Sequence, residues 1–233
     1  MDLDLKKLKV IDPLKPQASV DLDGQAGTSP FDPPDEYSQP VNNGVTPENM
    51  HPYLRGFVDE HTEFSERLDR LDSLVADIKT QGAITDELFT QLKKFFDEFE
   101  SEVFEHNRRE ERELFPILRV RMLERGEHSS GPERTTPVNV LEGEHIEAVR
   151  ISAVALGFCA LAHKLEHPES RQMVLSIAVE RCEALAKLMR LHIFREDRIV
   201  FALAQEFLSP DELEKLGEGH ADHPQADGLG EGS

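Results

Sequence analysis

Apolar residues recur every three or four positions along four long stretches of the chain, which is the spacing of one buried face of an α-helix. Each stretch opens with a helix-start signal, a threonine cap or a proline at the first helical position. We expect these helices to begin at Thr46, Thr85, Thr136 and Pro168. The second should end at Arg125, before a glycine, and the fourth near Phe207. The pattern predicts an all-α fold, an up-down-up-down four-helix bundle.

The rest of the chain lacks this periodicity. Residues 1–45 are interrupted by many prolines, so we expect an extended or disordered N-terminal arm. Residues 46–208 should form the bundle. Residues 209–233 should hold a short helix, opened by a capping box at Ser209, and then an acidic, glycine-rich tail. Pro116 lies inside the second helix and should bend it.

One histidine falls within each predicted helix, and these histidines are His61, His106, His145 and His192. His106 and His192 are each followed four residues later by a glutamate, Glu110 and Glu196. This step places the imidazole and the carboxylate on one helix face, where both can reach a metal ion. In a chain with 10 histidines about one such pair is expected by chance, so the spacing alone is weak evidence. The alternative is a bundle core with four buried histidines and no metal.

The spacing of the four histidines along the chain indicates that all of them lie at the same height in the bundle. In an up-and-down bundle, residues at the same height are equally far from the turn that joins their helices. The midpoints between successive histidines fall at residues 83–84, 125–126 and 168–169, each beside an independent turn signal. Glu110 is then a buried carboxylate, which needs a partner such as a metal ion. Its neighbours Glu111, Arg112 and Glu113 are expected on a solvated face.

The composition restricts the possible partners. With a net charge of −20 and a pI near 4.8, the chain should repel nucleic acid and anionic membranes and suits a cation or a basic protein. Cys159 and Cys182 form no Cys-x2-Cys clip, which excludes a thiolate zinc or iron–sulfur site and fits two core residues in a reducing compartment. No apolar run approaches the ~20 residues of a membrane span, and the first residues lack the pattern of a signal peptide. We expect a cytoplasmic protein.

The ordered motifs are His61, His106-x3-Glu110-Glu111-x2-Leu114-Phe115-Pro116, Glu144-His145 and His192-x3-Glu196. Over about residues 50–208 this set resembles the hemerythrin-like, or HHE cation-binding, family. The resemblance implies a bundle around a non-haem di-iron centre, two Fe ions with an oxo or hydroxo bridge. Four histidines and two glutamates are similar to the branch that includes bacterial repair-of-iron-centres proteins. The resemblance to this branch implies that His61, His106, His145 and His192 are terminal metal ligands and that Glu110 and Glu196 are bridging carboxylates.

Counting these ligands leaves an open position on each iron, where dioxygen, peroxide or nitric oxide could bind. Oxygen carriers of the family use five histidines, and this chain has Ala148 and Val149 where the fifth would lie. Three functions remain open. They are binding of a small oxidant or diatomic gas in sensing or stress response, iron donation to damaged iron centres through an iron–sulfur protein partner, and di-iron oxidation of an organic substrate. Whether the chain is an enzyme is left open, and zinc or manganese suits the same ligands.

Overall fold

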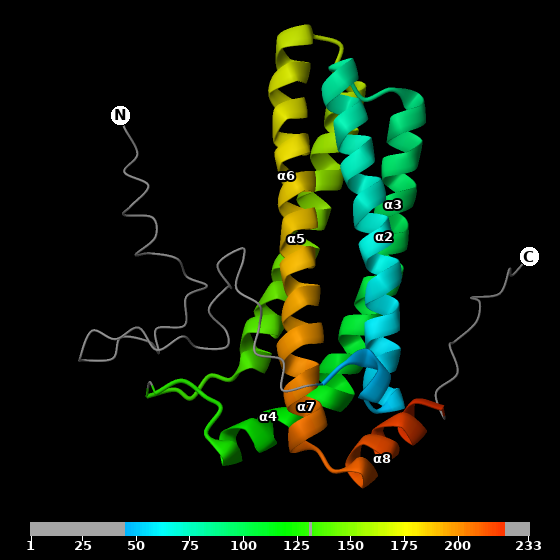
Figure 1. The fold of residues 1–233 in the computed structure, drawn as a ribbon. Helices are drawn as coiled ribbons and strands as arrows, with labels where there is room; N and C mark the ends of the chain where they lie inside the picture. Colours follow the sequence, from blue (N-terminus) through cyan, green and yellow to red (C-terminus); the bar gives the residue numbers. More distant parts are fainter. Residues whose placement is uncertain (1–44, 131, 222–233) are drawn as a thin grey trace, which may run out of the picture.

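The computed structural model describes residues 45–130 and 132–221, and the regular structure within them is entirely helical. Four long helices run up and down side by side (Figure 1). They are α2 (Pro52–Gln81), α3 (Asp86–Arg109), α5 (Pro137–Lys164) and α6 (Pro168–Arg195). α2 packs against α3, α3 against α5 and α5 against α6, and α6 closes the ring against α2. The predicted four-helix bundle is confirmed.

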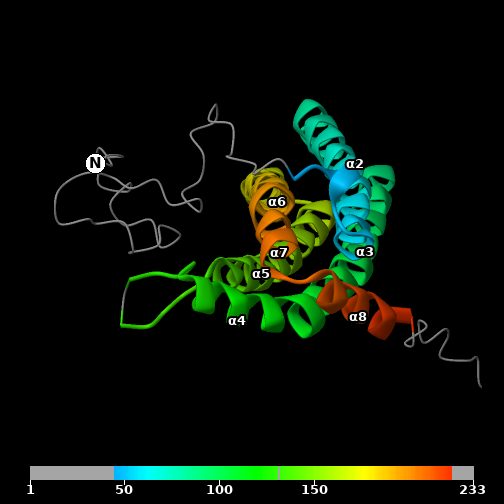
Figure 2. The same ribbon diagram turned by 60° about the horizontal axis from the view of Figure 1, so that its bottom comes forward.

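The second and fourth helices of the bundle each contain a π-helical turn at the same place. The turns are η3 (Glu110–Leu114), followed by α4 (Phe115–Arg125), and η4 (Glu196–Val200), followed by α7 (Phe201–Phe207). In each, the N–H of the phenylalanine donates to the carbonyl of the glutamate five residues earlier. α4 runs away from the direction of α3 (Figure 2). Pro116, expected to cause this bend, is the second residue of α4, so the π turn already separates the two segments before the proline.

The helix ends follow the sequence signals. The Thr85 hydroxyl accepts a hydrogen bond from the Leu88 N–H at 3.3 Å and caps α3. Gly82 and Gly126 end α2 and α4 with φ of 66° and 83°, in the left-handed conformation that favours glycine. Each midpoint between successive histidines therefore lies in, or directly beside, a loop of the bundle.

The first long helix begins later than expected. Residues Pro47–Asn49 form a single 3₁₀ turn, η2, and α2 begins only at Pro52. Pro52 has no N–H to donate to the preceding turn, so a helix that began at Thr46 could not continue regularly through it. His51 caps α2 instead, and its Nδ1 accepts from the Tyr53 N–H at 3.3 Å. The predicted start at Thr46 was wrong because this second proline follows so closely.

The interior has two apolar layers along the bundle axis. One lies among the four long helices and includes Phe64 and Val103. The other lies at the end where α4, α7 and α8 (Pro210–Ala221) gather, and it includes Phe115 and Phe201 (Figure 1). The buried polar side chains described below lie between these two layers, because each of their helices contributes apolar residues on both sides of them.

Helix α5 has an unusually apolar composition. Among the described residues it is the one helix whose length and hydropathy would allow it to cross a membrane, and 33% of its most apolar window is buried. That test rests on length and composition alone, and α5 carries the buried Glu144 and His145 and packs against α3 and α6. Cys159 of α5 and Cys182 of α6 are buried in the core, as expected, with their Sγ atoms 3.9 Å apart.

The expected short helix after the bundle is present. The Ser209 hydroxyl accepts from the Glu212 N–H at 3.3 Å, and Oε2 of Glu212 accepts from the Ser209 N–H at 2.8 Å, which is the predicted capping box. α8 then continues to Ala221. All but the last residue of the predicted N-terminal arm (1–45) lies outside the described residues, as do residues 222–233 of the predicted tail.

Candidate metal centre

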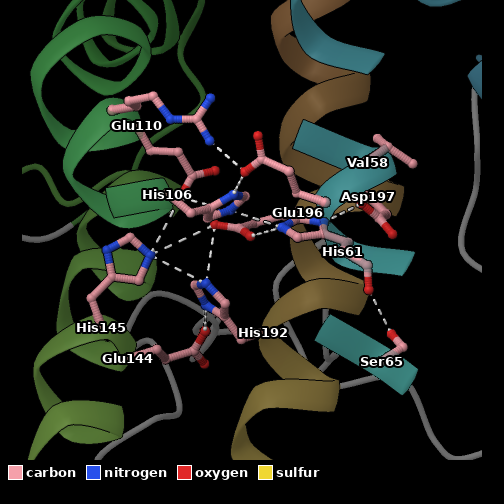
Figure 3. A network of polar contacts seen from close by, with 12 residues as sticks. Val58, His61, Ser65, His106, Glu110, Glu144, His145, His192, Glu196 and Asp197 are labelled. Carbon is pink, nitrogen blue, oxygen red and sulfur yellow. Dashed lines mark hydrogen bonds and ion pairs between the residues drawn. The ribbon is translucent and has the colours of Figure 1, made fainter. Parts of the chain in front are cut away.

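Six buried polar side chains, the predicted ligands, converge at one level of the bundle (Figure 3). Each long helix supplies one histidine, and the first residue of each π turn supplies a glutamate. Their exposed fractions are His61 2%, His106 2%, His145 4%, His192 2%, Glu110 0% and Glu196 0%. The shared level expected of the four histidines is therefore seen, and their role as metal ligands stays a prediction.

The imidazoles face one another in pairs. Nε2 of His61 lies 3.0 Å from Nε2 of His106, and Nε2 of His145 lies 3.2 Å from Nε2 of His192. Two nitrogens this close repel each other through their lone pairs unless a proton or a cation lies between them. One pair comes from α2 and α3, and the other from α5 and α6, so each half of the bundle contributes one.

The outer nitrogen of every imidazole, Nδ1, meets a carboxylate. The contacts are His61 with Asp197 (2.7 Å), His106 with Glu60 (2.7 Å), His145 with Glu111 (2.8 Å) and His192 with Glu144 (3.1 Å). An ionised carboxylate can only accept a hydrogen bond, so each Nδ1–H donates and each Nε2 is turned to the centre. Such partners are typical of metal-binding histidines, because they select the tautomer and the ring orientation.

The two glutamates lie between the histidine pairs. Oε2 of Glu196 is 3.2 Å from Nε2 of His61, and its Oε1 is 3.2 Å from Nε2 of His192. Oε2 of Glu110 is 3.6 Å from Nε2 of His106 and 3.5 Å from Nε2 of His145. Each glutamate therefore connects one half of the bundle with the other.

The charge distribution of this cluster fits a cation. None of the four oxygens of Glu110 and Glu196 accepts a hydrogen bond of good geometry, although both side chains are fully buried. A buried carboxylate without compensation costs several kcal/mol. The possible ligand atoms lie within 4.8 Å of one another in two groups, Glu110 with His145, His192 and Glu196, and His61 with His106 and Glu196. A metal ion in the first group would compensate both glutamates, and an ion in either group would separate the nitrogen lone pairs of the histidines in that group.

The site is built from two similar halves of sequence. Glu60-His61 on α2 corresponds to Glu144-His145 on α5, and Arg109-Glu110-Glu111 corresponds to Arg195-Glu196-Asp197. In both halves the arginine forms an ion pair with the glutamate that precedes the histidine, Arg109 with Glu60 and Arg195 with Glu144. The site therefore has approximate two-fold symmetry in its inner ligands, its outer carboxylates and their arginines.

The two halves differ in their contact with solvent. The side chains of Arg195 and Glu144 are 3% and 2% exposed, whereas those of Arg109 and Glu60 are 16% and 34% exposed. The outer carboxylate of His192 is thus enclosed, and that of His106 reaches the surface. At the other two histidines the outer carboxylates are both partly exposed, Asp197 25% and Glu111 43%, so the difference is confined to the partners of His106 and His192.

The charges of the cluster shift the pKa values of its members. Burial disfavours the imidazolium of His61, but the hydrogen bond with Asp197 and the negative charges of Glu196 and Asp197 outweigh burial and raise its pKa to about 10. Burial is also overcome at His145, where Glu110 and Glu196 raise the pKa to about 10. Burial lowers the pKa of His192. A cation that binds Nε2 of His61 or His145 must therefore displace a proton.

The outer carboxylates were not recognised from the sequence. Glu111 was expected on a solvated face and is 43% exposed, but its Oε1 also lies 2.8 Å from Nδ1 of His145. This contact was missed because the extra residue of the π turn changes which side chains face α5, and a regular helical wheel does not contain it. The available signal was repetition, since an acidic residue precedes His61 and His145 and follows Glu110 and Glu196.

Comparison with known families agrees with this geometry. The model of the hemerythrin HHE cation binding domain matches residues 53–204. The chain belongs to this family. The match includes all six candidate ligands, so this hemerythrin-like protein is a cation-binding protein with a buried histidine and glutamate cluster. No curated protein and no solved structure gave a match.

Proposed function

We propose that this hemerythrin-like protein is a non-haem di-iron protein that binds a small oxidant or diatomic gas, O2, NO or peroxide, at a carboxylate-bridged centre in sensing or stress response. The proposal rests on four imidazoles whose Nε2 atoms turn inward and on two fully buried glutamates that accept no hydrogen bond. Such a cluster is unfavourable without a cation. Imidazole and carboxylate donors in this combination suit iron.

The distribution of donors supports two metal positions. Oε2 of Glu196 faces His61 and its Oε1 faces His192, the arrangement of a carboxylate that bridges two ions. One position has the donors Glu110, His145, His192 and Glu196, and the other has His61, His106 and Glu196. The second position has fewer protein donors, so it has more room for an added ligand. We therefore place the small ligand on the His61–His106 side.

Bound iron would supply an open coordination position and accessible redox states. The chain itself maintains the geometry. The four outer carboxylates keep the rings oriented, with Nε2 directed to the centre. Phe57 and Phe64 meet the ring of His106 edge-on, and Phe201 stacks on His61, so aromatic rings exclude water from this side of the centre.

Metal analysis combined with absorption spectroscopy of the purified full chain tests this proposal. We expect about two iron atoms per chain after loading with ferrous iron. We also expect a visible spectrum that changes on exposure to air, NO or peroxide. Iron-loaded protein whose spectrum is unaffected by all three ligands would contradict the proposal, as would a chain that takes up no iron.

A second function, iron donation to damaged iron centres, is favoured by the exposure of the outer residues. Glu60 and Asp197, which support the His61–His106 side, are 34% and 25% exposed, a position from which an ion could leave. The net charge of −20 suits a basic or iron–sulfur protein partner and argues against nucleic acid or an anionic membrane. Transfer of iron to an apo iron–sulfur protein, faster than to a chelator of equal affinity, would favour donation over gas binding.

A further inference from the structure

An apolar cavity lies beside the candidate metal centre, between α2, α3 and α6. It is lined by Phe64, Arg67, Leu68, Phe95, Phe99, Val103 and Met189. The space that a water-sized sphere can occupy inside it is about 10 Å³. That is about the room for one water-sized molecule, so the cavity suits a ligand of very few atoms.

The cavity borders the His61–His106 side of the centre. Phe64, Val103 and Met189 of the lining lie three residues, or one helical turn, from His61, His106 and His192. The ring of Phe64 meets that of His106 edge-on with 5.2 Å between centroids, and it lies 6.2 Å from the ring of His61. One aromatic ring therefore separates the cavity from the position with fewer protein donors.

A charged pair marks the mouth of the cavity. Six of its seven lining side chains are apolar and no more than 6% exposed, so the opening to solvent must be at the seventh, Arg67, which is 18% exposed. Arg67 on α2 forms an ion pair with Glu102 on α3, whose side chain is 38% exposed. This pair spans the two helices at the outer end of an apolar passage.

We propose that the cavity is the entry and binding site of an uncharged diatomic molecule, O2 or NO, on its way to the His61–His106 side, with the Arg67–Glu102 pair as its outer closure. The inference rests on the proposed function for its destination. An apolar interior favours such molecules and disfavours anions, which would lose their hydration without gaining a partner. The size of the cavity selects against an organic substrate.

Xenon is a probe of the cavity that does not depend on the metal. In the full chain we expect a saturable xenon site, detected by xenon NMR or in crystals under xenon pressure, because dry apolar cavities bind this gas. Val103→Phe should abolish the site by filling it, and Val154→Phe, the same change at an exposed position of α5, should preserve it. If Val103→Phe does not fold, Val103→Leu repeats the test with a smaller increase in side-chain volume. Unchanged xenon binding in a folded Val103 variant would overturn the assignment.

Stopped-flow NO binding to iron-loaded protein tests the route. We expect Val103→Phe to slow association by about tenfold with unchanged iron content, and Arg67→Ala to accelerate it. Arg70→Ala removes a similar contact between α2 and α3, with Glu98, outside the cavity lining and should leave the rate unchanged. Equal rates in wild type, Val103→Phe and Arg67→Ala would overturn the route. A wild type that binds xenon but shows no response to NO or O2 would instead contradict the proposed function.

Discussion

Glu110 and Glu196 are equivalent residues of two separate π-helical turns, and both are fully buried. Each accepts, through its backbone carbonyl, the N–H of a phenylalanine five residues later, Phe115 or Phe201. The wider turn lets the glutamate face the centre while the next acidic residue, Glu111 or Asp197, reaches a histidine on a neighbouring helix. π turns are rare and occur frequently at functional sites. Their symmetric placement here supports a paired role for the two glutamates.

Removal of one inner ligand should release metal. We expect His106→Ala or Glu110→Ala to lose most of the bound metal, and also stability, because the remaining ligands would stay buried without an ion. Metal content per chain by mass spectrometry and thermal unfolding measure the two effects. His163→Ala is the control, since His163 lies on the same bundle but contacts the exposed Asp86. Full metal retention in either ligand variant would refute the assignment.

The outer carboxylates should tune metal affinity without being ligands. Glu144→Gln keeps the shape of the side chain but weakens the hydrogen bond from Nδ1 of His192, and we expect metal affinity to fall by about 10- to 100-fold. Competition with a chromogenic chelator measures the change. Glu147→Gln, an exposed position of the same helix, should keep wild-type affinity. Equal affinities in the two variants would show that Glu144 does not support the centre.

The buried ion pair between Arg195 and Glu144 should contribute more to stability than ion pairs at the surface. Arg195→Met leaves the carboxylate of Glu144 buried with its main positive partner gone, and we expect a loss of about 3–5 kcal/mol in the free energy of unfolding. Arg190→Met removes a pair with Asp69 and Asp72 at the surface and should cost about 1 kcal/mol or less. Urea unfolding of both variants without added metal tests this difference, and similar losses would argue against it.

The phenylalanines that follow the π turns should be structural supports of the histidines. Phe115 stacks on His145 and Phe201 on His61, with 5.9 Å and 5.7 Å between ring centroids, and both phenylalanines are fully buried. Phe115→Ala and Phe201→Ala should each cost about 3–5 kcal/mol of stability through the cavity they leave. Phe89→Ala, at a half-buried ring stacked on His163, is the control and should cost less. Equal losses at all three positions would contradict this interpretation.

The sequence by itself determined the bundle and the inner ring of the site. Apolar spacing, threonine caps and glycine stops are local signals, so they were sufficient for the helices that begin at Thr85, Thr136 and Pro168. Equal distances from the turns then placed the four histidines at one level, because an up-and-down bundle has a simple geometry. The predicted helix start at Thr46 was wrong because two prolines follow it, Pro47 and Pro52, and the long helix begins at Pro52.

Only the tertiary structure decided the outer parts of the site. Glu60, Glu111, Glu144 and Asp197 look like other surface acids in an acidic chain, and each becomes a partner of a histidine on a different helix through packing. The π turns depend on one extra residue per turn, which apolar periodicity does not reveal. The cavity beside His106 arises where three helices meet without filling the space. Contacts between distant segments depend on the rotation and depth of packed helices, which no single stretch of sequence specifies.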